Sequence, residues 1–268
     1  MRAQVVELVR YLIKGCAGES LDRSAVGRTG LADDRLFMLV DADGKFVTQR
    51  TRPPLAVVRP RLAGTRLALS APGMDDLEFD IVYDGDRLEV LLFFWEGKAI
   101  DQGTDPAVWF SEYLGETCRL VRVLPDHERR SNGLTQGYAG FADAHALHVT
   151  SNSSLDNLNN RIGGELPLPM NRFRPNVVIS GWSEPHTEDR VRRMTAGQVE
   201  MGYEKRAIRC VVPTVDPATG RKAGHEPTKT LAGYRREPEG GVSFGAKFAV
   251  VTPGVLAVGD EVAVTEWE

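Results

Sequence analysis

The first half of the chain is a succession of short apolar runs separated by turn residues, and this spacing constrains the fold most. Residues 36–40 are apolar, Asp41-Ala42-Asp43-Gly44 is a turn tetrapeptide, and a second run follows over residues 45–50. Two runs joined in this way predict a β-hairpin. Comparable runs occupy residues 5–13, 59–70, 77–83, 88–95 and 118–123. Many short strands at regular spacing predict a barrel or a sandwich.

The rest of the chain indicates a mostly β protein with a few helices, in the α+β class. We expect helices over residues 107–114, from an N-cap at Ser153 or Ser154 to Ile162, and over residues 226–234. Further strands are expected over residues 176–181, 197–203, 246–251 and 255–264. The polar stretch 125–136 is a loop and a candidate domain joint. We therefore expect one domain over residues 1–124 and a second over residues 125–268.

Charge and cysteine content exclude several classes of protein. The net charge of −4 and a pI near 5.8 argue against general nucleic-acid binding, although a local basic pocket is still allowed. The apolar opening segment is broken by Glu7 and Arg10 and is too short to span a membrane. Three cysteines without paired spacing fit neither a disulfide framework nor a zinc site. We expect a cytoplasmic protein that binds no nucleic acid and no membrane.

The segment around Cys210 carries the strongest chemical signal. Arg209 precedes the cysteine, and a neighbouring guanidinium favours the thiolate form, which binds metals and attacks electrophiles. Val211, Val212 and Val215 predict a short strand, and Asp216-Pro217 with Gly220 predicts the turn that ends it. Two interpretations stay open at this point. Cys210 is either a buried structural cysteine or a reactive thiolate at a strand edge.

Four further features could contribute to a site, and each also has a plain structural interpretation. Lys14-Gly15-Cys16 offers a charge and a close backbone N–H to an anion, or is an ordinary turn. Asp33-Asp34-Arg35 directs an arginine into a site, or forms surface ion pairs. Arg174 precedes Pro175, which predicts an extended conformation and a guanidinium placed for phosphate beside Asn176. His145, at a loop-to-strand boundary, is a base or ligand, or simply polar surface.

Common catalytic signatures do not occur in the sequence. It has no Walker-type phosphate loop, no G-x-G-x-x-G, no H-E-x-x-H, no G-x-S-x-G and no C-x-x-C pair. The sequence therefore does not indicate a nucleotide enzyme, a serine hydrolase or an iron–sulfur protein.

Taken together, six ordered motifs resemble the MOSC family, in its two-part branch with an N-terminal β-barrel, over essentially the whole chain. The motifs are Tyr11-Leu12-Ile13-Lys14-Gly15, Gly30-Leu31 with Asp34-Arg35, Thr48-Gln49-Arg50, Phe173-Arg174-Pro175-Asn176, Arg209-Cys210 through Pro217, and the C-terminal set from Glu226-Pro227 to Gly259-Asp260. The resemblance implies an N-terminal MOSC β-barrel domain followed by a C-terminal MOSC β-barrel domain. It also implies a basic cleft between the two domains.

The resemblance further implies a molybdenum cofactor, Mo-molybdopterin, in that cleft. Cys210 would be the metal ligand and a catalytic residue, and Lys14, Arg35 and Arg174 would hold the phosphate and pterin. Asn176 would form a hydrogen bond nearby. Asp216 and His145 are the candidate proton donors. Other positions that match the cofactor lining in the family are Gly15, Asp143, Ala144, His145, Ile208, Arg209 and Lys247.

The implied activity is the reduction of N-hydroxylated small molecules to amines or amidines. Electrons would come from a separate ferredoxin, cytochrome b5-like protein or flavin reductase, because we expect no fused iron–sulfur domain and no membrane anchor. Two departures from the family pattern stand out. Gly15 often is serine in relatives, and Ala207 replaces a cysteine that many relatives carry. The alternative function is a sulfur carrier or cofactor-transfer protein that works through a persulfide on Cys210.

Overall fold

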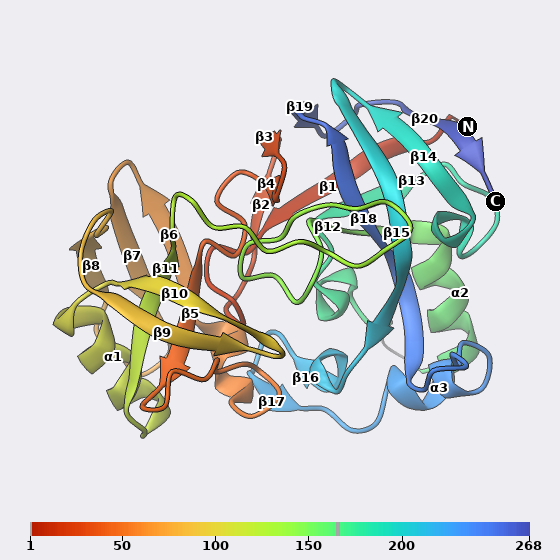
Figure 1. Cartoon of the computed structure of the whole chain (residues 1–268). Helices are drawn as coiled ribbons and strands as arrows, with labels where there is room; N and C mark the ends of the chain where they lie inside the picture. The colour runs from red at the N-terminus through yellow and green to blue at the C-terminus, as the bar shows by residue number, and fades with distance from the viewer. Residues whose placement is uncertain (1, 165–166) are drawn as a thin grey trace.

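The computed structural model describes residues 2–164 and 167–268, and it shows a mostly β chain arranged around two groups of strands that lie side by side (Figure 1). The expected class is therefore confirmed. None of the helices in the described residues combines the length and apolar character needed to cross a lipid bilayer.

The first group of strands forms a half-barrel from most of the N-terminal half. Its four-stranded sheet has the order β5 (Phe37–Asp41), β11 (Cys118–Val123), β10 (Trp95–Asp101) and β9 (Arg87–Leu92). A smaller antiparallel sheet joins β6 (Arg59–Ala63), β7 (Arg66–Ser70) and β8 (Leu77–Asp80). The 3-10 helix η1 (Pro53–Val57) and helix α1 (Thr104–Leu114) accompany them. Phe37, Leu67 and Phe110 are fully buried in the shared core.

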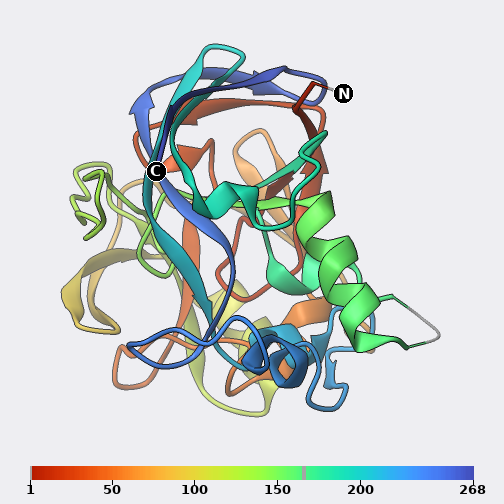
Figure 2. The same ribbon diagram turned by 90° about the vertical axis from the view of Figure 1, so that its right-hand side faces the viewer.

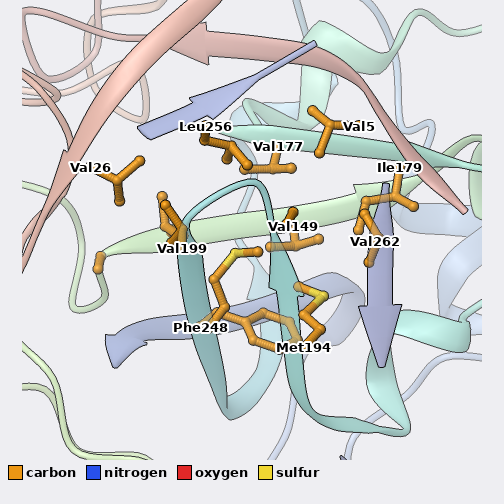
Figure 3. Packing of buried hydrophobic residues seen from close by; sticks show 14 of the residues in the cluster. Val5, Val26, Val149, Val177, Ile179, Met194, Val199, Phe248, Leu256 and Val262 are labelled. Carbon is orange, nitrogen blue, oxygen red and sulfur yellow. The ribbon is translucent and has the colours of Figure 1, made fainter. Parts of the chain in front are cut away.

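The second group is an eight-stranded sheet that draws strands from both ends of the chain. Its order is β2 (Glu19–Leu21), β1 (Gln4–Arg10), β13 (Val177–Ser180), β12 (Leu147–Ser151), β18 (Val242–Thr252), β15 (Val199–Arg209), β14 (Val191–Ala196) and β20 (Val262–Trp267). Only the β12–β13 pairing among these is parallel. The apolar inner faces of these strands enclose a core that includes Val149, Met194 and Phe248 (Figure 3).

The opening strand links the two groups. β1 pairs with β13, so the first residues of the chain belong to the C-terminal sheet and not to the half-barrel. β3 (Arg23–Gly27) also crosses over, pairing with β4 (Gly30–Leu31) on one side and β19 (Gly254–Ala257) on the other. Helix α2 (Asn152–Ile162) lies along the eight-stranded sheet, away from the half-barrel (Figures 1 and 2). The chain therefore passes from the eight-stranded sheet to the half-barrel after β1, and Lys14 lies in this connecting region between the two groups of strands.

Several expected boundaries were wrong. The strand expected over residues 211–215 is mostly the 3-10 helix η4 (Val212–Thr214), because Pro213 has no N–H to donate to a ladder and Thr214 N–H bonds back to the carbonyl of Val211 at 3.0 Å. Only β16 (Val215–Asp216), paired with β17 (Arg221–Lys222), remains extended. The strand expected over residues 197–203 instead continues to Arg209. Cys210 therefore follows a long strand.

The helices and the first hairpin also differ in detail. Ser151 is the N-cap of α2, with its hydroxyl accepting from the N–H of Ser154, in place of the two serines that we expected. Helix α3 is confined to Thr228–Ala232. Beyond Phe46 the expected second strand of the first hairpin gives way to a turn, because the carbonyl of Thr48 accepts from the N–H of Arg52 at 2.8 Å.

Candidate active site

A cavity lies at the junction of the two groups of strands, and it gathers most of the residues that the sequence singled out. Its lining residues come from the segment after β1, the residues on either side of β5, the loop before β12 and β12 itself, the turn before β13, the end of β15 with η4, and β18. They are Lys14, Gly15, Arg35, Thr48, Gln49, Arg50, Ala142, Asp143, His145, His148, Phe173, Arg174, Asn176, Arg209, Cys210, Val212 and Lys247. Ala144, Ile208 and Asp216 are not among them.

Cys210 is the exposed cysteine of the chain. Its neighbour Arg209 donates from Nη2 to the carbonyl oxygen of Phe173 at 2.9 Å, which fixes the end of β15 beside the turn that carries Arg174. Cys16 and Cys118 are buried, and burial raises their thiol pKa values to about 12 and about 11. These two thiols stay protonated and enclosed, so only Cys210 is accessible to a metal or an electrophile.

Two arginines of the lining adopt left-handed backbone conformations. Arg35 has φ +48°, and Arg174 has φ +55° and ψ +49°. The extended conformation expected for Arg174 is therefore wrong. Arg174 ends the 3-10 helix η2 (Met170–Phe173), and its N–H bonds to the carbonyl of Asn171 at 3.2 Å. Such conformations persist only where the surroundings enforce them, and they cluster at functional sites.

The side chains of these arginines converge on one aromatic ring. The guanidinium carbons of Arg35 and Arg174 lie 4.2 and 4.1 Å from the ring centroid of Tyr11. Arg35 Nη1 also donates to Asp34 Oδ2 at 2.5 Å, so this arginine pairs with the adjacent acid and lines the cavity at once. Stacking on a ring holds a guanidinium in place while leaving its N–H groups free to bind an anion.

Asn176 joins three elements at the back of the cavity. Its Oδ1 accepts from Arg35 Nη1 at 3.0 Å and from the N–H of His148 at 3.2 Å, and its Nδ2 donates to the carbonyl of Val9 at 3.1 Å. The amide is 1% exposed. Its hydrogen bonds fix the position of Arg35 relative to Val9 of β1 and His148 of β12.

Lys14 and Asp143 form an ion pair across the junction of the two halves. Lys14 Nζ donates to Asp143 Oδ1 and, at 3.0 Å, to the carbonyl of Phe141. Partial burial alone would raise the pKa of Asp143, but the ammonium groups of Lys14 and Lys247 outweigh it and hold that pKa well below its usual range. Asp143 is therefore ionised at any physiological pH, and the exposure of more than half of its side chain to water favours the same charged form.

The cavity carries a strong excess of positive charge. Among the described residues that line it, six side chains are Lys or Arg and one is a carboxylate, that of Asp143. Burial, aided by Arg209, lowers the pKa of Lys247 to about 7, and burial lowers the pKa of Arg174 to about 10. Arg209 Nε is buried with no hydrogen-bond partner in the described part of the chain. Cations that repel one another, with a buried donor left unsatisfied, fit an anionic ligand.

The backbone conformation of Gly15 explains why this position is a glycine. Its φ is +90°, a conformation that favours glycine, and a Cβ would approach Leu55 Cδ1 to 3.3 Å. The carbonyl of Gly15 accepts from Gln49 Nε2 at 2.6 Å. The turn that we expected at Lys14-Gly15-Cys16 is present, and its residues Lys14 and Gly15 form part of the cavity wall.

Asp216 has a turn role in the structure. Its Oδ1 accepts from the N–H of Ala218 at 2.9 Å, and its carbonyl accepts from Gly220 at 2.8 Å. The Asp-Pro-x-x-Gly turn is confirmed, and nothing in these contacts supports Asp216 as a proton donor. Ile208 is half exposed, with its side chain outside the lining.

Sequence reasoning assigned no role to several residues that shape the site. Thr48, Gln49 and Arg50 line the cavity, and the Thr-Gln-Arg motif was the available signal for them. Arg129 is buried and donates to the carbonyls of Gly140, Ala142 and Asp143, which fixes the loop that presents Asp143. Glu204, buried behind His145, had no signal in the sequence, because its partners are distant along the chain.

The donor set is compatible with an anionic metal cofactor. One accessible thiol stands among guanidinium and ammonium groups, which suits a soft metal held by a thiolate beside a bound phosphate. The described residues contain no group of three His, Cys, Asp or Glu side chains that could hold a metal ion alone. A metal here would need most of its ligands from a bound organic group.

Comparisons with known proteins agree with this geometry. The model of the MOSC N-terminal beta barrel domain matches residues 2–117, and that of the MOSC domain matches residues 136–263. The chain is 33% identical to mitochondrial amidoxime-reducing component 1 of Mus musculus, covering 96% of this chain and 81% of that protein. It is 34% identical to mitochondrial amidoxime reducing component 2 of Rattus norvegicus, covering 94% and 80%. The crystal structure of the YUAD protein from Bacillus subtilis aligns over 98% of this chain and 94% of that one, at 12% identity and a TM-score of 0.46, which is too weak a likeness to carry an argument.

Proposed function

Because the chain belongs to the MOSC family, we propose that it is a molybdenum-cofactor-dependent oxidoreductase that reduces N-hydroxylated compounds to amines or amidines. The observation that carries this proposal is the single accessible thiol, Cys210, at the edge of a cavity lined by six basic side chains. Its relatives named as amidoxime-reducing components support the substrate class. We further propose the division into domains at residues 1–124 and 125–268.

The proposed roles follow from the contacts of each residue. Cys210 would bind molybdenum through its thiolate, and Arg35 and Arg174, already held on Tyr11, would bind the phosphate and pterin of the cofactor. Lys14 and Lys247, which both lower the pKa of Asp143, would add positive charge to the site. The bound cofactor would supply the two-electron chemistry. The electrons would reach it from a separate redox protein.

The first test is metal and pterin content. We expect near-stoichiometric molybdenum in the protein purified from a cofactor-producing host, and its loss in Cys210→Ala. Val211→Ala is the matched control, because Val211 is half exposed and adjoins Cys210 without lining the cavity. Turnover of an amidoxime with an artificial electron donor should follow metal content across the three proteins. Full metal content and turnover in Cys210→Ala would contradict the proposal.

The exposure of Cys210 also favours a second function, sulfur or cofactor transfer through a persulfide. The same preparations separate the two. A carrier would contain no molybdenum in a cofactor-replete host and would release sulfide from Cys210 on treatment with a reductant. Because Cys16 and Cys118 are buried, alkylation of the native protein reports on Cys210 alone.

A further inference from the structure

A buried carboxylate stands directly behind the histidine of the cavity. His145 Nδ1 lies 2.5 Å from Glu204 Oε2, and the two side chains are 4% and 0% exposed. His145 lines the cavity, and no described residue forms a hydrogen bond with its other ring nitrogen, Nε2. A carboxylate that accepts from Nδ1–H fixes the tautomer that leaves Nε2 free to accept a proton. The imidazole is thus anchored on one side and open to the cavity on the other.

Glu204 is itself held on its remaining oxygen. Ser131 Oγ donates to Glu204 Oε1, and the N–H of Gly137 donates to Ser131 Oγ at 2.8 Å. The loop that carries Ser131 lies across β15 (Figure 1), where the N–H of Leu134 bonds to the carbonyl of Glu204 at 3.0 Å. A Cβ at Gly133 would lie 2.3 Å from Glu204 Cβ, so the loop seats directly on this residue. Both carboxylate oxygens are therefore satisfied, as a buried charge requires.

We infer that His145 is a proton-relay residue for the proposed reduction, and that Glu204 and Ser131 are the positioning residues behind it. The inference rests on the proposed function. Reduction of R–NH–OH to R–NH2 and H2O consumes two electrons and two protons, with cleavage of the N–O bond. The electrons come from the separate redox protein. One proton passes from solvent through His145 Nε2 to the reacting group, and the second proton comes from solvent without passing through His145. The imidazole is neutral before and after the transfer.

The charges around His145 suit this role. Burial lowers the pKa of His145, Glu204 opposes that effect, and Lys247 and Lys205 add to it. The loop that carries Ser131 also presents Asn132, which accepts from Lys205 Nζ at 2.8 Å, and Asp143 lines the same cavity as His145. The imidazole is neutral at rest, and a bound anion that offsets the two lysines favours its protonation. General acid–base catalysis of this kind contributes roughly 10²- to 10⁴-fold to a rate.

The first test measures the tautomer and the titration of the His145 imidazole and does not require catalytic turnover. In the full-length protein, nitrogen NMR of the histidine rings should show His145 as the Nδ1–H tautomer, assigned by its loss in His145→Gln. Glu204→Gln should move the titration of His145 to lower pH, because the carboxylate that stabilises the imidazolium is gone. Ser131→Ala should move it in the same direction by less. A proton on Nε2 at rest, or a titration unmoved in Glu204→Gln, overturns the inference.

The second test is the rate of amidoxime reduction with an artificial electron donor in metal-loaded protein. His145→Gln should keep its molybdenum and lose about 100-fold in kcat, with the basic limb of the pH profile changed. His225→Gln is the control, because His225 is exposed and does not line the cavity. Wild-type kcat and pH profile in metal-loaded His145→Gln overturn the relay while the proposed function stands. Failure of the metal-loaded wild type to reduce any N-hydroxylated compound removes the proposed function, and the relay with it.

Discussion

Arg35 Nη1 donates to Asn176 Oδ1 at 3.0 Å, so a side chain from just before β5 of the half-barrel is tied to the turn before β13 of the eight-stranded sheet. The same amide holds the carbonyl of Val9 and the N–H of His148. This buried asparagine therefore joins both sides of the junction that carries the cavity, alongside the ion pair of Lys14 with Asp143. Removing the Asn176 side chain should therefore lower the stability of the fold and also release Arg35 from its hydrogen bond.

We predict that Asn176→Ala lowers the free energy of unfolding by roughly 2 kcal/mol or more, because it leaves the Val9 carbonyl and the His148 N–H buried without a partner. Asn171→Ala is the control, because Asn171 is exposed on the same segment and should change stability by less than about 0.5 kcal/mol. Denaturant unfolding measures both. Equal stabilities for the two variants would show that the amide does not support the junction.

Gly245 should tolerate no side chain. Its φ is +74°, and a Cβ would lie 2.6 Å from His148 Nε2, Thr150 Cγ2 and the carbonyl of Val149. Gly64 is the matched control. Its φ is +61°, but nothing lies within 4 Å of the position that a Cβ would take, so a substitution there has only the cost of the left-handed backbone and no steric clash. We expect Gly64→Ala to cost roughly 1 to 2 kcal/mol of stability and Gly245→Ala to cost a further 1 to 3 kcal/mol. Thermal or chemical unfolding of both variants gives the difference, and equal losses would refute the overpacking.

The sequence predicted those parts of the fold and site that local patterns determine. Apolar runs between Asp/Gly turns identified most strands, and short motifs identified Lys14, Arg35, Arg174 and Cys210, which the fold then brings to one cavity. The strand expected after Cys210 is mostly absent because Pro213 has no N–H to donate to a ladder and the N–H of Thr214 bonds back to the carbonyl of Val211, which favours a 3-10 turn.

Long-range contacts were beyond local patterns. Glu204 lies in β15 within a run of four buried residues, and its role depends on His145, 59 residues away, and on Ser131, 73 residues away. The clamp by Arg129 depends in the same way on carbonyl groups that the fold brings within reach. No residue-type pattern encodes such a contact.

Buried Glu188 should give the protein a pH-dependent stability. Burial raises the pKa of Glu188 to about 7 from an ordinary value of 4.5, with Ser151 and Ser154 donating to it at 2.9 and 2.7 Å. The native state therefore binds more protons than the unfolded state between these pH values. The stabilisation is complete below about pH 4.5 and is lost as the pH rises through about 7.

We expect the free energy of unfolding to fall from pH 5 to pH 7.5 by an amount that Glu188→Gln removes, at most about 3 kcal/mol. The quantity to measure is the difference between wild type and variant at each pH, because other groups titrate in both. Glu184→Gln, at an exposed position nearby, should leave the pH dependence of the wild type intact. A Glu188→Gln protein with the wild-type slope would show that this carboxyl does not titrate in the range.

The loop that presents Asp143 should loosen when its clamp is removed. Arg129 donates to the carbonyl of Asp143 at 3.1 Å and to that of Gly140 at 2.7 Å, and it also contacts the carbonyl of Ala142. Arg129→Met keeps the length of the side chain but none of these hydrogen bonds. We expect faster amide hydrogen exchange over residues 140–143 and weaker retention of the proposed cofactor, because Asp143 would no longer be held against Lys14. Arg130→Met, at the exposed neighbouring position, should alter neither readout. Unchanged exchange in Arg129→Met would mean that the ion pair with Lys14 suffices to order the loop.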